Sequence, residues 1–131
     1  MQQGERRILG ARPLPTSPLY PMHIVLLPKR ILKSLPAIGA TETQGLNALA
    51  RVKFFTPDGR WSWYASEFDG TDLFFGFVVG FEPELGYFSL SELKGVRGAL
   101  GLPIERDRWF RPTPLRQLMI DAGVDWAKET Q

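Results

Sequence analysis

The fold is decided by residues 61–77, WSWYASEFDGTDLFFGF. Two apolar runs rich in aromatic residues flank the dipeptide Asp69-Gly70, an arrangement typical of a β-hairpin. Phe74 and Phe75 are neighbours in the second run, so on a strand their side chains point to opposite faces of the sheet. A strand with two apolar faces is central in its sheet, or its second face is covered by helices or by a partner.

The same pattern extends in both directions from this hairpin. Connections of only a few residues join the neighbouring apolar runs, which predicts antiparallel neighbours in a meander. We expect an α+β protein: a four- to five-stranded antiparallel meander sheet with about three short helices packed against it. Strands are expected near residues 50–56, 61–68, 73–81 and 85–90, with 104–110 as a charged edge strand or an extended arm. Helices are expected near residues 28–35, 91–97 and 113–123, the last with Thr113 as its N-cap and Pro114 as its first residue.

Composition bounds the class of protein. The chain has 131 residues and no cysteine, which suits one domain and excludes disulfides and thiolate chemistry. It has no apolar run of about 18 residues, so we expect no membrane contact and a cytoplasmic location. Residues 1–21 are predicted to be a flexible Pro-rich tail, 22–123 a single domain, and 124–131 a frayed C-terminal tail.

No motif for catalysis accompanies the aromatic block. His23 is the only histidine, and neither a nucleophile motif nor a Gly-rich phosphate loop is present. We therefore predict no catalytic residue, no cofactor and no metal. A carboxylate-dependent enzyme remains a third hypothesis, which requires Glu67, Asp69, Glu105 and Asp107 to converge in space.

The first candidate binding surface is acidic. Residues 34–92 carry eight Asp/Glu against three Lys/Arg. Glu67, Asp69 and Asp72 lie near the end of the predicted hairpin, where they can contact another protein or imitate DNA toward a DNA-binding enzyme. An interaction with another protein is the leading functional prediction.

The second candidate surface is basic and aromatic. Residues 93–116 carry six Lys/Arg against two acids. The region from Arg97 to Arg116 can hold phosphates while Trp109 stacks on a base, so a nucleic-acid-binding module is the alternative prediction. The residues assigned to this surface are Arg97, Arg106, Arg108, Trp109 and Arg111. The sheet aromatics such as Trp61 and Trp63 are expected to form the core.

Five short motifs occur in a fixed order: KFFTP (53–57), WSWYASEFDG (61–70), FFG (74–76), ELGYFSLSEL (84–93) and GLPIERD (101–107). Over roughly residues 26–118 they resemble the domain-of-unknown-function family 2958, short bacterial proteins often met on plasmids, phages and other mobile genetic elements. The resemblance implies no reaction. It implies a cytoplasmic accessory protein of mobile DNA, with a role in antirestriction, defence evasion or conjugation. Members of the family usually begin near the position of Met22, which favours residues 1–21 as an extension.

Overall fold

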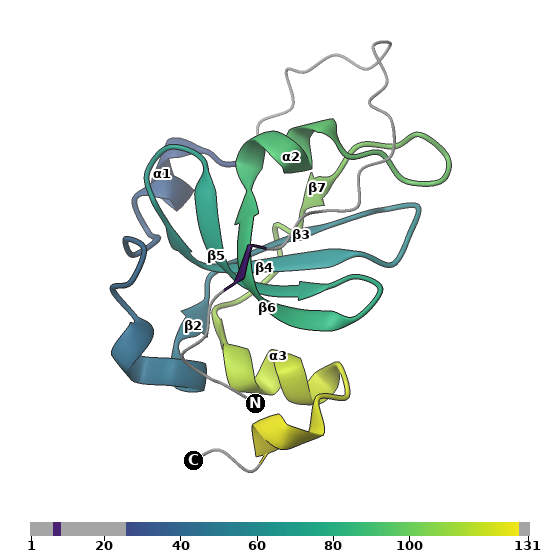
Figure 1. Ribbon diagram of the computed structural model, residues 1–131. Helices are drawn as coiled ribbons and strands as arrows, with labels where there is room; N and C mark the ends of the chain where they lie inside the picture. The colour runs from purple at the N-terminus through teal and green to yellow at the C-terminus, as the bar shows by residue number, and fades with distance from the viewer. Residues whose placement is uncertain (1–6, 9–25, 129–131) are drawn as a thin grey trace.

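The computed structural model describes residues 7–8 and 26–128, and its centre is a six-stranded sheet with the order β1-β6-β5-β4-β3-β7 (Figure 1). The five strands from β6 to β7 are antiparallel, and β1 pairs in parallel with the outer edge of β6. The predicted α+β meander is confirmed. The strands are β1 Arg7–Ile8, β3 Val52–Phe55, β4 Ser62–Phe68, β5 Leu73–Val79, β6 Pro83–Ser89 and β7 Glu105–Arg106.

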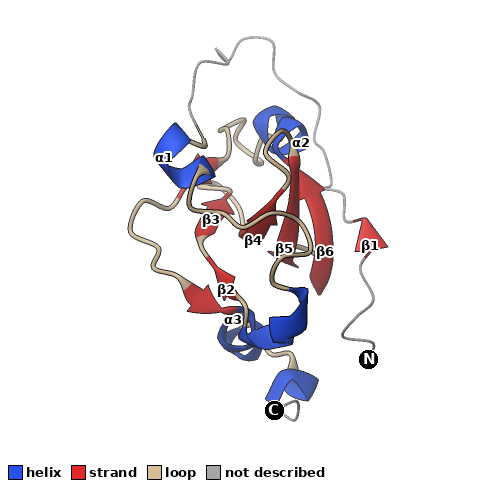
Figure 2. Ribbon diagram, turned by 90° about the vertical axis from the view of Figure 1, so that its left-hand side faces the viewer, coloured by secondary structure: helices blue, strands red, loops and turns tan. Residues whose placement is uncertain are grey.

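Short helices cover both faces of this sheet. Figures 1 and 2 place α1 and α2 on one side of it and α3 on the other. A small second sheet pairs β2 with β8 beside α3. The helices are α1 Lys29–Leu32, α2 Leu90–Gly95 and α3 Leu115–Asp121, with 3₁₀ turns η1 Glu42–Asn47 and η2 Asp125–Lys128; the short strands are β2 Leu49–Ala50 and β8 Thr113–Pro114. Within the described residues, no helix is long and apolar enough to cross a bilayer.

The aromatic block forms two apolar cores, one on each face of the sheet. Phe74 and Val78 of β5 point into the first core together with Trp63, while Phe77 points into the second. Both faces of β5 are therefore covered, as its two-sided pattern predicts. The buried rings are the largest side chains of both cores, so they contribute a large part of the hydrophobic stabilisation.

Several element boundaries differ from the sequence-based expectation, and two of the differences change what packs against the core. Pro114, not Thr113, is the N-cap of α3, because Thr113 pairs with Ala50 in the small sheet and Leu115 N–H donates to Ala48 O at 2.9 Å. Residues 124–128, part of the predicted frayed tail, are folded: η2 packs its fully buried Ala127 into the second core. Residues 129–131 lie outside the described residues, as does the predicted N-terminal tail except for Arg7–Ile8.

Candidate functional site

Glu67, the first of the three predicted acidic site residues, is completely buried. The register of β4 against β5 shifts between Ala65 and Glu67, and around this bulge the side chains of four consecutive residues, 65–68, are buried. Glu67 Oε1 accepts from Gly39 N–H at 2.7 Å, and Oε2 accepts from Thr41 N–H at 2.9 Å and from the Thr41 hydroxyl. The carboxylate thus fixes the loop that precedes η1, and no partner reaches it from solvent.

Asp69 and Asp72 also have partners within the chain. Asp69 Oδ1 accepts from the backbone N–H groups of Thr71, Asp72 and Leu73 at 2.8–3.0 Å, and these bonds, with that of Asp72 the strongest, lower the pKa of Asp69. Asp72 accepts from Ser91 N–H at 2.7 Å and from the Ser91 hydroxyl at 2.9 Å, which ties the β4–β5 hairpin to the first turn of α2. All three acids therefore organise the fold at this end of the sheet.

The four acids of the carboxylate-enzyme hypothesis do not come together. Glu105 on β7 pairs with Phe55, which pairs with Ser62 on β4. Glu67 lies five residues further along that strand, roughly 16 Å away at the rise of an extended chain. Within residues 26–128 the structure brings no three Asp, Glu or His side chains into a position to hold a metal ion.

Arg97, the first residue of the predicted basic surface, is 3% exposed. Its guanidinium donates through Nη1 to the carbonyl oxygens of Lys94 and Val96, at 3.0 and 2.9 Å, at the C-terminal end of α2. Cationic side chains satisfy helix C-terminal carbonyls in this way. The Arg97 guanidinium is thus engaged inside the fold, unlike the exposed Arg108 and Arg111.

Those other four, Arg106, Arg108, Trp109 and Arg111, lie together in residues 106–111, which we name the Arg–Trp segment. Trp109 is 88% exposed, and both Arg108 and Arg111 are exposed beside it in the chain. The segment begins at β7, which lies at the edge of the sheet and takes up only Glu105–Arg106 of the stretch 104–110 that is expected to be a charged edge strand or an extended arm.

A hydrogen-bonded turn fixes the Arg–Trp segment. Asp107 N–H donates to Lys53 O at 2.9 Å, and Asp107 Oδ1 accepts from Trp109 N–H at 2.9 Å. The next ring, Phe110, is half-buried and packs on Tyr64 with the ring centroids 5.6 Å apart. Trp109 therefore projects into solvent from a turn that is fixed on one side by Asp107 and on the other by Phe110.

The electrostatics of this segment include a cation from α1. Partial burial lowers the pKa of Arg106, and the nearby positive charges of Arg30 and Arg108 lower it further. The guanidinium still carries its charge at neutral pH. Among the described residues, no carboxylate forms an ion pair with these three arginines. Within the described residues, three cations therefore lie near one another without a direct ion pair.

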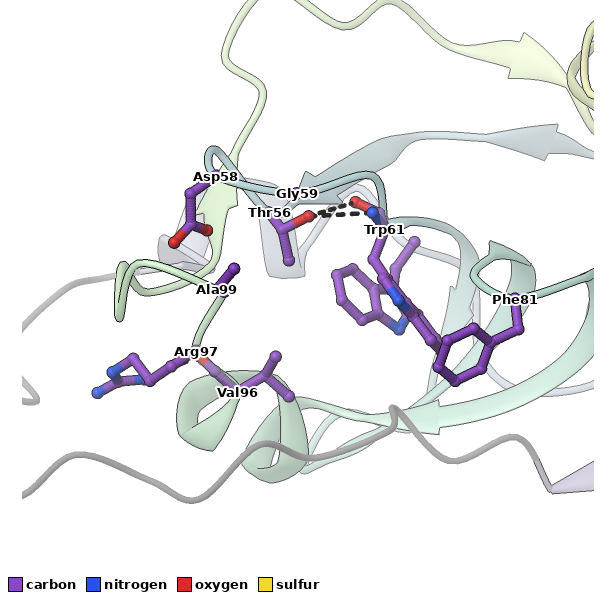
Figure 3. A pocket seen from close by; sticks show the side chains of 10 residues that line it. Thr56, Asp58, Gly59, Trp61, Phe81, Val96, Arg97 and Ala99 are labelled. Carbon is purple, nitrogen blue, oxygen red and sulfur yellow. Dashed lines mark hydrogen bonds between the residues drawn. The ribbon is translucent and has the colours of Figure 1, made fainter.

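A pocket that no pattern in the sequence indicates lies at the turn of the β3–β4 hairpin. It has a volume of about 420 Å³ and lies between the turn of that hairpin and the segment after α2 (Figure 3). Its lining includes Trp61, Trp63 and Phe81. The sequence shows these aromatics but gives no signal that residues 96–99, which are distant in the chain, lie opposite them.

The family model of a protein of unknown function (DUF2958) matches residues 26–127. This is most of the chain, and the match ends within η2. The chain belongs to this family. Neither the curated proteins nor the solved structures gave a match. Membership of DUF2958 confirms the resemblance stated from the five motifs and supplies no activity, so function must be argued from the surface.

Proposed function

We propose that this DUF2958 protein is a non-enzymatic binding module that contacts single-stranded nucleic acid through the Arg–Trp segment. The observation that carries the proposal is the 88% exposure of Trp109. Its ring lies between the exposed Arg108 and Arg111 in the chain, and its backbone N–H is bonded to Asp107. A ring this exposed offers its face to a partner. A base stacked on it contributes about 1–3 kcal/mol.

The charges around Trp109 suit phosphates. Arg108 and Arg111 are exposed, and Arg106 is half-buried beside Arg30, with no described acid paired to any of them. Guanidinium groups bind phosphate oxygens through two parallel hydrogen bonds. An unstacked strand offers bases and phosphates together, whereas the bases of a duplex are not free to stack on a side chain.

The leading sequence-based prediction, a protein partner at the acidic hairpin end, is less well supported by the contacts. Glu67 is buried, and Asp69 and Asp72 accept hydrogen bonds from the chain itself. An accessory role on mobile DNA, in antirestriction or conjugation, remains a prediction from the resemblance. Single-stranded DNA binding is compatible with it, because strand transfer exposes such DNA.

The test is fluorescence anisotropy of a labelled 15-nucleotide oligothymidylate between 50 and 300 mM KCl. If Arg106, Arg108 and Arg111 each neutralise one phosphate, the slope of log affinity against log salt should be about −2, at about −0.7 per phosphate. The double variant Arg108→Gln/Arg111→Gln should flatten that slope by about 1.4. Trp109→Ala should weaken binding about tenfold, while Trp109→Phe keeps most of the affinity.

Arg60→Gln is the matched control. It removes the same charge from an exposed arginine on a different turn, so it should leave the affinity unchanged. Absence of binding at micromolar protein in 50 mM KCl rejects the proposal. Binding that Trp109→Ala and the double arginine variant leave intact rejects this site. A partner that is captured after nuclease treatment, and lost with Trp109→Ala, would instead support a protein-binding role.

A further inference from the structure

The pocket beneath the β3–β4 turn has an aromatic wall. The Trp61 ring lies between Trp63, stacked at 5.6 Å, and Phe81, which meets it edge-on at 5.2 Å. Trp61 can lie there because Gly80 has no side chain: a Cβ on Gly80 would be 2.3 Å from the Trp61 ring. Phe81 is 79% exposed and stands at the rim of the pocket. The wall is thus built from three rings that reach from the core to solvent.

The opposite wall is held in place by Asp58. Its Oδ2 accepts from Leu100 N–H at 2.7 Å and from Leu102 N–H at 3.3 Å, which fixes the loop after α2. Gly98 lets the two segments meet, since a Cβ there would overlap the Asp58 carboxylate. Figure 3 shows Asp58 and Arg97 at one end of the pocket and Trp61 with Phe81 at the other. Both walls are therefore formed by contacts within the chain, without a ligand.

Trp63 Nε1 and Asp58 Oδ1 are buried atoms of the lining that have no hydrogen-bond partner among the described residues. Trp63 is 1% exposed, and its indole Nε1–H finds no hydrogen-bond acceptor among the described residues. Buried tryptophan N–H groups usually find one, because an unmade hydrogen bond inside a protein is costly. Asp58 Oδ1 is also without a donor, but it packs against Gly98. Beside the aromatic rings, the atom that lacks a partner is therefore a donor, and it requires a hydrogen-bond acceptor.

We propose that this pocket binds a small, flat, uncharged aromatic ring that carries a hydrogen-bond acceptor, and that Trp63 Nε1–H donates to this acceptor. Pockets of this size with apolar walls and few polar groups suit such ligands. Trp61 and Phe81 supply ring faces and edges for stacking. The Asp58 carboxylate disfavours an anion. The Arg97 guanidinium points away from the rings and donates to two carbonyl oxygens.

The site is separate in its residues from the Arg–Trp segment, so either proposal can fail alone. The experiment uses the full chain labelled with ¹⁵N and two bicyclic probes of the same shape, quinoline and naphthalene. Only quinoline has an acceptor nitrogen. Quinoline should shift the indole N–H signal that Trp63→Phe removes, and it should bind about fivefold more tightly than naphthalene, the range of one added hydrogen bond.

Three variants test the assignment. Trp63→Phe keeps an aromatic ring without the donor, so the preference for quinoline should fall to about onefold. Phe81→Ala changes an exposed side chain, leaves the core intact and should weaken both probes. Trp109→Ala, outside the pocket, should change neither affinity. Absence of shifts at Trp61, Trp63 and Val96 with either probe, or a quinoline preference that persists in Trp63→Phe, overturns the proposal.

Discussion

Glu67→Gln is the substitution that tests the buried carboxylate most directly. In the native fold Glu67 Oε1 accepts from Gly39 N–H, and Oε2 accepts from two groups of Thr41. Glutamine has the same shape but only one acceptor oxygen. With that oxygen toward Thr41, its NH₂ faces the Gly39 N–H donor, so one hydrogen bond is lost and the other two lose the help of the negative charge.

The expected cost follows from those contacts. A hydrogen bond to a charged group contributes about 1.5–3 kcal/mol, and a neutral one about 1 kcal/mol. Losing the bond to Gly39 and weakening those to Thr41 should therefore lower the free energy of unfolding by about 3 kcal/mol. Thr41→Val, which removes only the hydroxyl and keeps the backbone bond, should cost less, about 1–2 kcal/mol.

Urea unfolding followed by tryptophan fluorescence measures both variants. With a slope of about 1.5 kcal/mol/M, the midpoint for Glu67→Gln should fall by about 2 M. Amide hydrogen exchange should also become faster at Gly39 and Thr41, because the loop they belong to loses its anchor. A midpoint within about 0.3 M of the wild type would refute the reasoning that this carboxylate anchors the loop.

Three further changes test the sheet, the hairpin end and α2. Gly76→Ala should lower stability by about 3 kcal/mol or more, because its Cβ would lie 1.8 Å from Tyr64 O; a melting temperature within a few degrees of the wild type contradicts this. Asp69 has a folded pKa below its unfolded value, so its contribution is present above about pH 4 and is lost as pH falls through the folded pKa. Asp69→Asn should therefore lose less stability than the wild type between about pH 4 and 2, and equal losses in urea titrations argue against it. Ser89 Oγ accepts from Glu92 N–H at 3.1 Å as the N-cap of α2, so Ser89→Ala should cost about 1 kcal/mol by urea unfolding; no change would mean that this cap does not stabilise α2.

The strands could be predicted from sequence because their signals are local. Asp69-Gly70 has Gly70 at φ +90°, a conformation that suits glycine, and the apolar runs on each side alternate with the period of a strand. The two-sided pattern of β5 likewise predicted a strand covered on both faces. Membership of the family rested on motifs that are also local in the chain.

The candidate site was predicted only in part, because its composition depends on contacts between distant residues. Sequence placed Arg97 with the other arginines, but its guanidinium satisfies the carbonyls at the end of α2. It marked Glu67 as a surface acid, but the bulge after Ala65 keeps that side chain inside. The pocket walls come from segments about forty residues apart, Asp58 and Leu100, and no local pattern links them.

The sequence by itself determined the α+β class, the meander order of β3 to β6 and the family, since alternation, turn chemistry and motifs act over a few residues. Only the tertiary structure decided which charged side chains are exposed and which are hydrogen-bonded inside the fold. In the sequence, Glu67 and Asp72 cannot be told from solvated acids. In the fold, each accepts hydrogen bonds from a residue that is distant in the chain, Glu67 from Thr41 and Asp72 from Ser91. The sequence likewise does not distinguish Trp109 from Trp63, whereas in the fold Trp63 is buried and Trp109 is exposed to solvent. Burial and hydrogen-bond partners are properties of the whole fold, and they select the Arg–Trp segment and the Trp63 pocket from all the candidate residues.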